Sequence, residues 1–175
     1  MSHKTAWLLI PIVALFADNS CFATSTNDYV IEQIASCLSH AQQSRSALQD
    51  WITGCFSKDK DGQTFVNTKE ADFASDLTAR NDACLDVCSR VFTTVSLVNL
   101  VTESDKRKEA LSILRTVLLS EQDRLQRELF MLQAEPKDIP AATHFTKLVK
   151  ESTETTLSMI EKVAAHYDLA LKEDK

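Results

Sequence analysis

The sequence predicts an all-α protein: an antiparallel bundle of about four long helices, stapled by disulfides, that follows a cleaved signal peptide. Three observations predict this fold. The 175 residues include only two glycines and three prolines, too few for the tight turns of a sheet protein. Several long stretches repeat apolar residues at alternating spacings of three and four, which is the period of a helix face. Four cysteines follow an export-type N-terminus, a combination that is typical of disulfide-bonded proteins.

Residues 1 to 23 have the pattern of a secretory signal peptide. Lys4 precedes an eleven-residue apolar run, which is about half of the ~20 residues that span a bilayer as a helix. We therefore expect no stable membrane anchor and a secreted or periplasmic location. Cleavage after Ala23 would leave a single helical domain, residues 24 to 175, with four cysteines. A cut after Ala17 would keep a fifth cysteine, so we expect the cut after Ala23.

The four remaining cysteines are Cys37, Cys55, Cys84 and Cys88. In a chain bound for an oxidising compartment, two disulfides are expected. Their spacings of 18, 29 and 4 residues match no zinc-ligand pattern. We therefore predict that the cysteines are structural, and we expect no cofactor.

The first mature helix is predicted over about residues 28 to 56, with Asn27 or Thr26 as its N-cap. Its core face repeats with spacings of four and three throughout, and includes two of the cysteines. The residues on this face are Val30, Ile34, Cys37, Ala41, Ser44, Leu48, Trp51 and Cys55.

Two disulfides between straight helices are not possible with this spacing. On an unbroken helix, Cys37 and Cys55 lie about 27 Å apart, whereas Cys84 and Cys88 lie one turn apart on the next helix. The polar run at residues 42 to 46 is a place where the first helix could bend. We predict a bend there that brings Cys37 and Cys55 together near the other two cysteines.

Residues 59 to 70, DKDGQTFVNTKE, place oxygen-bearing side chains at alternate positions between the first two helices. The segment resembles the EF-hand calcium loop, with Asp59 at position 1, Asp61 at position 3 and Glu70 at the bidentate position 12. The resemblance implies a calcium ion held between two helices. Position 5 is a glutamine, and Thr64 replaces the glycine of the sharp turn at position 6. The alternative is a solvated polar connector, which we expect, and no metal site is assigned.

The second helix is predicted to begin near Thr68 and to include the most apolar stretch, residues 82 to 101. One face of this stretch holds Cys84, Cys88, Val91, Val95 and Val98. Its β-branched content also fits a strand, but a run of this length without turn signals favours a helix. If the first two helices form a hairpin that turns near Gly62, Cys37 lies opposite Cys88.

A third helix is predicted over about residues 105 to 135, with Ser104 as its N-cap. Its apolar face consists of Leu111, Leu114, Leu118, Leu125, Leu129 and Leu132. Glu121 falls on this face, and we expect its aliphatic stem to pack while its carboxylate reaches an edge.

The fourth helix is predicted over about residues 141 to 172, after a connector between Pro136 and Pro140. Ser152 and Thr156 make the middle of its buried face half-polar. Their hydroxyls can bond to backbone carbonyls one turn back, so no ligand is needed to explain them.

Several classes of function are disfavoured by the sequence. The net charge is −6, and the single basic cluster, residues 106 to 108, is flanked by acidic residues, so we expect no nucleic-acid binding. His144 and His166 each lack a second ligand or catalytic partner one helical turn away. We therefore expect that the protein is not an enzyme.

The remaining expectation is a non-enzymatic protein of the inhibitor, immunity or adaptor type that binds a protein partner. Two alternatives stay open: a carrier that holds a small ligand in the bundle core, and a calcium-modulated helical module that uses residues 59 to 70. The apolar surface is widest where the second helix meets the third. There we place the candidate partner-binding residues Phe92, Leu97, Leu100, Ile113 and Val117.

Overall fold

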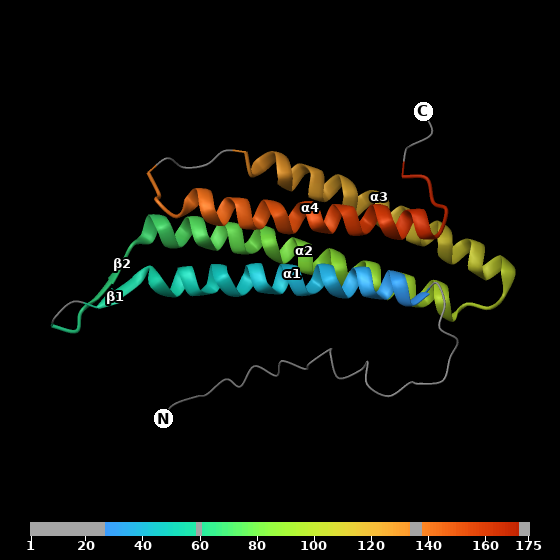
Figure 1. Ribbon diagram of the computed structural model, residues 1–175, viewed down its shortest axis with the longest axis horizontal. Helices are drawn as coiled ribbons and strands as arrows, with labels where there is room; N and C mark the ends of the chain where they lie inside the picture. Colours follow the sequence, from blue (N-terminus) through green and yellow to red (C-terminus); the bar gives the residue numbers. More distant parts are fainter. Residues whose placement is uncertain (1–26, 59–60, 134–137, 172–175) are drawn as a thin grey trace, which may run out of the picture.

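Four long helices make up most of the protein, as the sequence predicts. The computed structural model describes residues 27 to 58, 61 to 133 and 138 to 171; the predicted signal peptide, residues 1 to 23, lies outside them. The elements are α1 (Asn27–Gly54), β1 (Phe56–Lys58), β2 (Thr64–Val66), α2 (Thr68–Leu100), α3 (Ser104–Met131) and α4 (Ala142–His166). The four helices lie side by side and alternate in direction along the chain (Figure 1). The all-α fold class is therefore confirmed.

The most apolar helix, α2, lies at the centre of the packing and contacts α1, α3 and α4. Val87, Val91, Val95 and Val98 are fully buried in the main core. Among the described residues, α2 is the one helix that is long and apolar enough to cross a membrane, and 44% of its apolar window is buried within the protein. Contacts with all three neighbouring helices account for this composition, because the core helix of a bundle is apolar on most sides.

A second core cluster lies near the end of the bundle that carries the β strands. It contains four buried residues that are far apart in the sequence, Leu48, Leu77, Leu132 and Val149. Around them pack Trp51, Phe73 and Phe145. This cluster joins the ends of α1 and α3 to the starts of α2 and α4.

The connector between α1 and α2 is a β-hairpin, which the sequence did not predict. Phe56 pairs with Val66 and Lys58 with Thr64 in an antiparallel ladder. Gly62 lies in the turn with a φ of 79°, a conformation that glycine adopts without the strain of a side chain. The turn falls near Gly62, as predicted, but the strands are only three residues long, too short for a period-two pattern to be visible.

The predicted bend in α1 is wrong. The helix is continuous from Asn27 to Gly54 and passes through residues 42 to 46 without a break. Ser44 is buried in the core and donates to the carbonyl of His40 at 3.1 Å, while the other four residues of the run are exposed. The polar run therefore marks the solvent face of a straight helix.

Two helix ends differ from the prediction. At the start of α3, Glu103 occupies the N-cap position, and Ser104 is the first helical residue. At the end of the chain, α4 stops at His166 because Asp168 takes a positive φ of 53°. Leu169 then packs back against the core, so the final described residues cover the bundle instead of extending the helix.

Candidate functional site

Three of the four cysteines lie in the middle of the core. The sulfur of Cys88 on α2 donates to the sulfur of Cys37 on α1, with 3.1 Å between them. Cys37 in turn donates to Thr156 Oγ1 on α4 at 3.3 Å. All four cysteines are free thiols in the structure. The predicted placement of Cys37 opposite Cys88 is thus confirmed, although no covalent bond joins them here.

The contact between the two sulfur atoms shifts the pKa values of the two thiols in opposite directions. The hydrogen bond from Cys88 lowers the pKa of Cys37, and burial opposes this effect. The same hydrogen bond raises the pKa of Cys88, and burial adds to the increase. If the pair ionises, the thiolate therefore forms at Cys37, and Cys88 keeps its proton.

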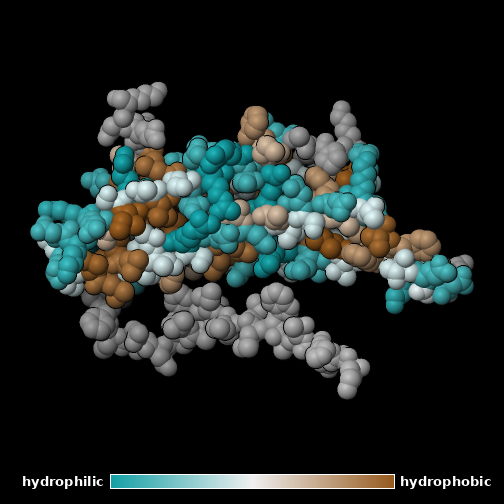
Figure 2. Space-filling model, turned by 180° about the vertical axis from the view of Figure 1, so that it is seen from behind, coloured by the Kyte–Doolittle hydropathy of each residue, from teal (hydrophilic) through white to brown (hydrophobic). Residues whose placement is uncertain are grey.

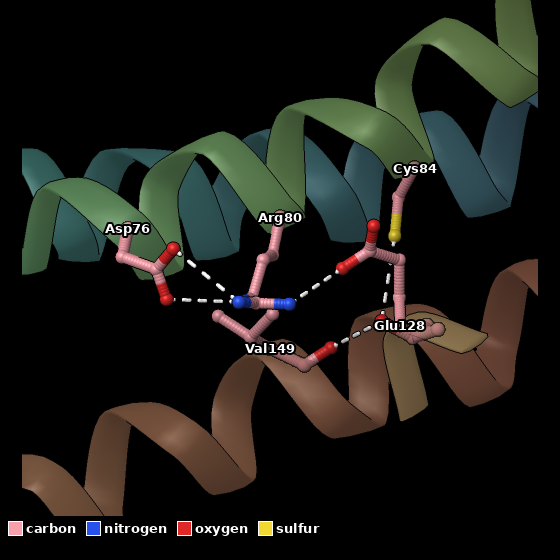
Figure 3. Close-up of polar contacts among 6 residues, drawn as sticks. Asp76, Arg80, Cys84, Glu128 and Val149 are labelled. Carbon is pink, nitrogen blue, oxygen red and sulfur yellow. Dashed lines mark hydrogen bonds and ion pairs between the residues drawn. The ribbon is translucent and has the colours of Figure 1, made fainter. Parts of the chain in front are cut away.

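Cys84 lies one turn from Cys88 and faces α4 instead of α1. Its sulfur is 3.6 Å from Thr153 Oγ1, which donates to the carbonyl of Val149 at 2.9 Å. Burial raises the pKa of Cys84. Figure 3 shows this contact beside an ionic link in which Arg80 of α2 donates to Glu128 of α3 at 2.8 Å. Cys84 therefore belongs to the packing between α2 and α4.

Cys55 is separated from the other three cysteines. It follows the end of α1, donates from its backbone to the carbonyl of Trp51 at 3.1 Å, and accepts from the backbone of Asn67 at 3.0 Å. On the continuous α1, Cys37 and Cys55 lie about 27 Å apart. The predicted arrangement with two disulfides around a bent α1 is therefore not the arrangement of this structure, because the bend does not exist.

The calcium-loop resemblance falls on the β-hairpin. Glu70 Oε1 accepts from the indole nitrogen of Trp51 at 2.7 Å, and its Oε2 accepts from Asn67 Nδ2 at 2.7 Å. Both oxygens that would supply the bidentate ligand are thus engaged: Oε1 joins α2 to α1, and Oε2 bonds the N-cap residue of α2. Asp59 lies outside the described residues, while Asp61 is described. Within the described ranges, no three acidic, cysteine or histidine side chains are grouped closely enough to hold a metal ion.

The five candidate partner-binding residues do not share one environment. Leu97, Leu100 and Ile113 have exposed fractions of 54%, 77% and 52%. Phe92 and Val117 are half-buried, and Phe92 packs against the main core. Figure 2 shows hydrophobic residues gathered at the end of the bundle where α2 meets α3. Leu97 and Leu100, one turn apart near the end of α2, are the exposed pair at that end.

A small apolar cavity lies between α1 and α2. Its volume is about 90 Å³, and Ile34, Leu38, Cys88 and Phe92 are among the residues that line it. Small-molecule sites typically enclose roughly 300 Å³ or more. This cavity is therefore too small for an organic ligand without a rearrangement of the core.

Glu121 lies on the core face of α3, as predicted, but its carboxylate does not reach an exposed edge. Glu121 is only 4% exposed. Its Oε1 lies 2.9 Å from Arg90 Nη1, and its Oε2 lies 3.6 Å from Arg124 Nη1. The two guanidinium groups come from α2 and α3 and cover the carboxylate. Because Arg90 is on another helix, the sequence pattern of α3 gave no sign of this pairing.

Comparisons with protein-family models, curated proteins and solved structures found no significant match to this chain. Function is therefore inferred from the residues and their geometry alone.

Proposed function

We propose that this is an exported, non-enzymatic interaction protein that binds a protein partner at the end of the bundle where α2 meets α3. The observation that carries the proposal is the exposure of Leu97 and Leu100, which lie one turn apart on the same side of α2. Burying a leucine side chain contributes about 1.5–3 kcal/mol. Two neighbouring leucines therefore supply the apolar centre that a binding surface needs.

Charged residues follow the exposed leucines along the chain. Lys106 pairs with Glu103 at 3.0 Å, and Lys108 pairs with Asp105 at 3.5 Å, all on the exposed start of α3. An apolar centre with a polar, solvent-accessible rim is the usual composition of a protein interface. This arrangement supports a protein partner over a lipid surface or a small ligand.

The carboxylates of Glu70, which is half-buried, and Glu121, which is buried, support a non-enzymatic role. Glu70 is held by Trp51, and Glu121 by Arg90. A general acid or base needs an oxygen that is free to exchange a proton with a substrate. In this protein Oε1 of each residue instead joins one helix to another.

The disulfide in the exported form belongs to the same proposal. Instead of two bridges, we propose one, between Cys37 and Cys88. Their sulfur atoms are 3.1 Å apart, and a disulfide bond is about 2.05 Å long, so small side-chain rotations are enough to close it. The bridge would fix α1 to α2 in the middle of the bundle.

Partner binding is tested with two pairs of substitutions on the oxidised protein. Leu97→Asp with Leu100→Asp changes the proposed surface, and Phe130→Asp with Met131→Asp changes a second exposed apolar pair at the far end of α3. Each form is immobilised and exposed to the envelope fraction or culture fluid of the source organism. Circular dichroism first establishes that each variant is folded.

The expected result is a protein that is captured by the native form and by the Phe130 and Met131 variant, but not by the Leu97 and Leu100 variant. Capture that is equal for all three forms would contradict the proposed surface. Light scattering on the purified protein identifies a second copy of this chain as the partner, if the native form is a dimer and the Leu97 and Leu100 variant is a monomer.

A further inference from the structure

We propose that Cys37 is the site where an external organic disulfide reacts with this protein, through a pocket between α1 and α4, and that Cys88 then displaces the bound thiol. This inference rests on the proposed bridge between Cys37 and Cys88. It adds which sulfur reacts first, by what route the oxidant arrives, and which charge the oxidant carries.

Cys37 can be reached from the surface of the protein. Cys37 lines a pocket of about 160 Å³ whose other walls include the polar side chains of Gln33, Ser36, Thr155 and Lys162. Ser36 and Lys162 are exposed, so the pocket opens to the surface of the protein. It is too small to enclose an organic disulfide, but only the sulfur end of an extended reagent has to enter it to reach Cys37. Because its walls are polar, a charged or polar oxidant can enter without losing all of its hydration.

Cys88 has a different approach. It lines the cavity of about 90 Å³ between α1 and α2, where most of the wall is apolar. A polar disulfide that entered there would lose its water without gaining hydrogen bonds. The two sulfur atoms are in contact with each other, yet the polar route from the surface leads to Cys37.

A positive charge lies beside the Cys37 pocket. Lys162 is the ionic side chain among the residues that line the Cys37 pocket, and its Nζ donates to Gln33 Oε1 at 2.8 Å. This hydrogen bond joins α4 to α1 beside the pocket. A positive charge at this place attracts anionic disulfides and repels cationic ones.

The chemistry is a pair of thiol–disulfide exchanges. The Cys37 thiolate attacks one sulfur of the oxidant, a new sulfur–sulfur bond forms, and the first external thiolate leaves with the bonding electrons and takes up a proton. Cys88 then loses its proton and attacks the sulfur of Cys37, which expels the second external thiol. Two protein thiols are oxidised to one disulfide, and one external disulfide is reduced to two thiols.

The acidities of the two cysteines agree with this order. The hydrogen bond from Cys88 lowers the pKa of Cys37, so Cys37 is the better source of a thiolate. Once Cys37 is part of a mixed disulfide, it no longer accepts as a thiolate, and Cys88 is released from the interaction that raises its pKa.

The order of reaction is tested with single variants of the reduced, folded protein. Cys88→Ser and Cys37→Ser are each treated with dithiodiglycolate, an anionic disulfide, and peptide mass spectrometry locates the bound thioglycolate. We expect the adduct to accumulate on Cys37 in Cys88→Ser, at least about tenfold faster than on Cys88 in Cys37→Ser. Equal rates, or a faster reaction at Cys88, would overturn the inference. Cys88→Ala repeats the measurement without a new hydroxyl group.

An experiment on the native protein tests the Cys37–Cys88 bridge and the order of reaction separately. Non-reducing peptide mapping after the same treatment should find Cys37 joined to Cys88. An adduct that stays on Cys37 in the native protein would refute the proposed bridge while supporting entry at Cys37. A bridge that forms in the native protein, together with preferential labelling of Cys88 in Cys37→Ser, would refute the order of reaction alone.

The role of charge is tested by comparing dithiodiglycolate with cystamine, a cationic disulfide, in a Cys88→Ser background. We expect the anionic reagent to label Cys37 faster, and Lys162→Gln to slow labelling by this reagent about three- to fivefold, the effect of one charge at ~5 Å in water, and so to reduce the preference. Lys150→Gln, on the same helix but outside the pocket, is the matched control. An unchanged preference in Lys162→Gln would contradict the proposed role of Lys162.

Discussion

The indole ring of Trp51 lies flat on the ring of Phe145, with 4.2 Å between the ring centroids and 5° between the planes. The indole nitrogen also donates to Glu70 Oε1 at 2.7 Å. Trp51, on α1, thus contacts α4 through its ring and α2 through its nitrogen. Because these contacts depend on the packing of three helices, Trp51 fluorescence reports on the hairpin end of the bundle.

Calcium is expected to leave this fluorescence unchanged. Both oxygens of Glu70 already accept hydrogen bonds, from Trp51 and from Asn67, and a calcium ion would have to displace them. The measurement is a calcium titration followed by chelation, with the melting temperature as a second signal. A reversible change that disappears in Asp59→Ala would contradict this expectation and favour the calcium-modulated alternative.

Glu70→Ala is expected to lower the free energy of unfolding by about 1–3 kcal/mol. The substitution removes a charged acceptor from the partly buried Trp51 nitrogen and a partner of the α2 N-cap residue Asn67. Urea denaturation followed by circular dichroism measures the change. Asp72→Ala alters an exposed acid half a turn later in α2 and should change stability by less than about 0.5 kcal/mol. An equal effect of the two substitutions would contradict the role assigned to Glu70.

Oxidation is expected to raise the free energy of unfolding by about 2–4 kcal/mol. Cys37 and Cys88 are 51 residues apart, and closing a loop of this length removes conformational entropy from the unfolded chain. Denaturation with and without reductant measures the difference. Cys55→Ser should keep the full effect of oxidation, and Cys37→Ser should lose it. If Cys55→Ser loses the effect, Cys55 takes part in the bridge instead.

Arg90→Met is expected to lower stability by about 1–3 kcal/mol, because it removes the nearest cation from the buried carboxylate of Glu121. The control is Arg127→Met, which breaks a pair with Asp123 of similar length, 2.9 Å, in which both side chains are exposed. Exposed pairs contribute little, so this change should stay below about 1 kcal/mol. Equal losses in the two variants would show that burial of Glu121 does not strengthen its pairing.

Asn81→Leu is expected to leave stability unchanged or to increase it. Asn81 is fully buried, its Nδ2 donates to the carbonyl of Ala41 at 2.8 Å, and its Oδ1 lacks a hydrogen-bond partner among the described residues. An apolar side chain of similar size removes this unpaired acceptor. Chemical denaturation measures the change. A loss of more than about 2 kcal/mol would show that the bond between Asn81 and Ala41 outweighs the cost of burying the amide.

The sequence predicted which residues of α1 and α2 face each other, because this depends on only two structural features. A constant rise per residue and a turn near Gly62 place Cys37 opposite Cys88, and the structure has both features. The bend in α1 was wrong because it was inferred from the requirement that all four cysteines pair. The unbroken repeat of three and four residues through Ala41, Ser44 and Leu48 already indicated a straight helix.

The contacts between distant helices could not be read from the sequence. Lys162 and Gln33 are 129 residues apart in the sequence. They form a polar pair beside Cys37 only because α4 packs against α1. In the same way, the spacing in α3 placed Glu121 on the buried face but gave no information on Arg90. Helix periodicity predicts which residues face inward, whereas the partner of each residue depends on how the helices are arranged.

The last described residues, 167 to 171, lie at the end of the bundle where α2 meets α3. Tyr167 donates to Asn99 at 2.9 Å, and Arg115 Nε donates to the carbonyl of Ala170 at 2.9 Å, so the last described residues lie beside the junction of α2 and α3. The start of α1 lies at the same end (Figure 1). An affinity tag joined directly before Asn27 or directly after Leu171 would therefore be tethered close to Leu100 and would mask it. An anchor attached through the β-hairpin, about 50 Å away along α2, would instead present the leucines outward to the solution.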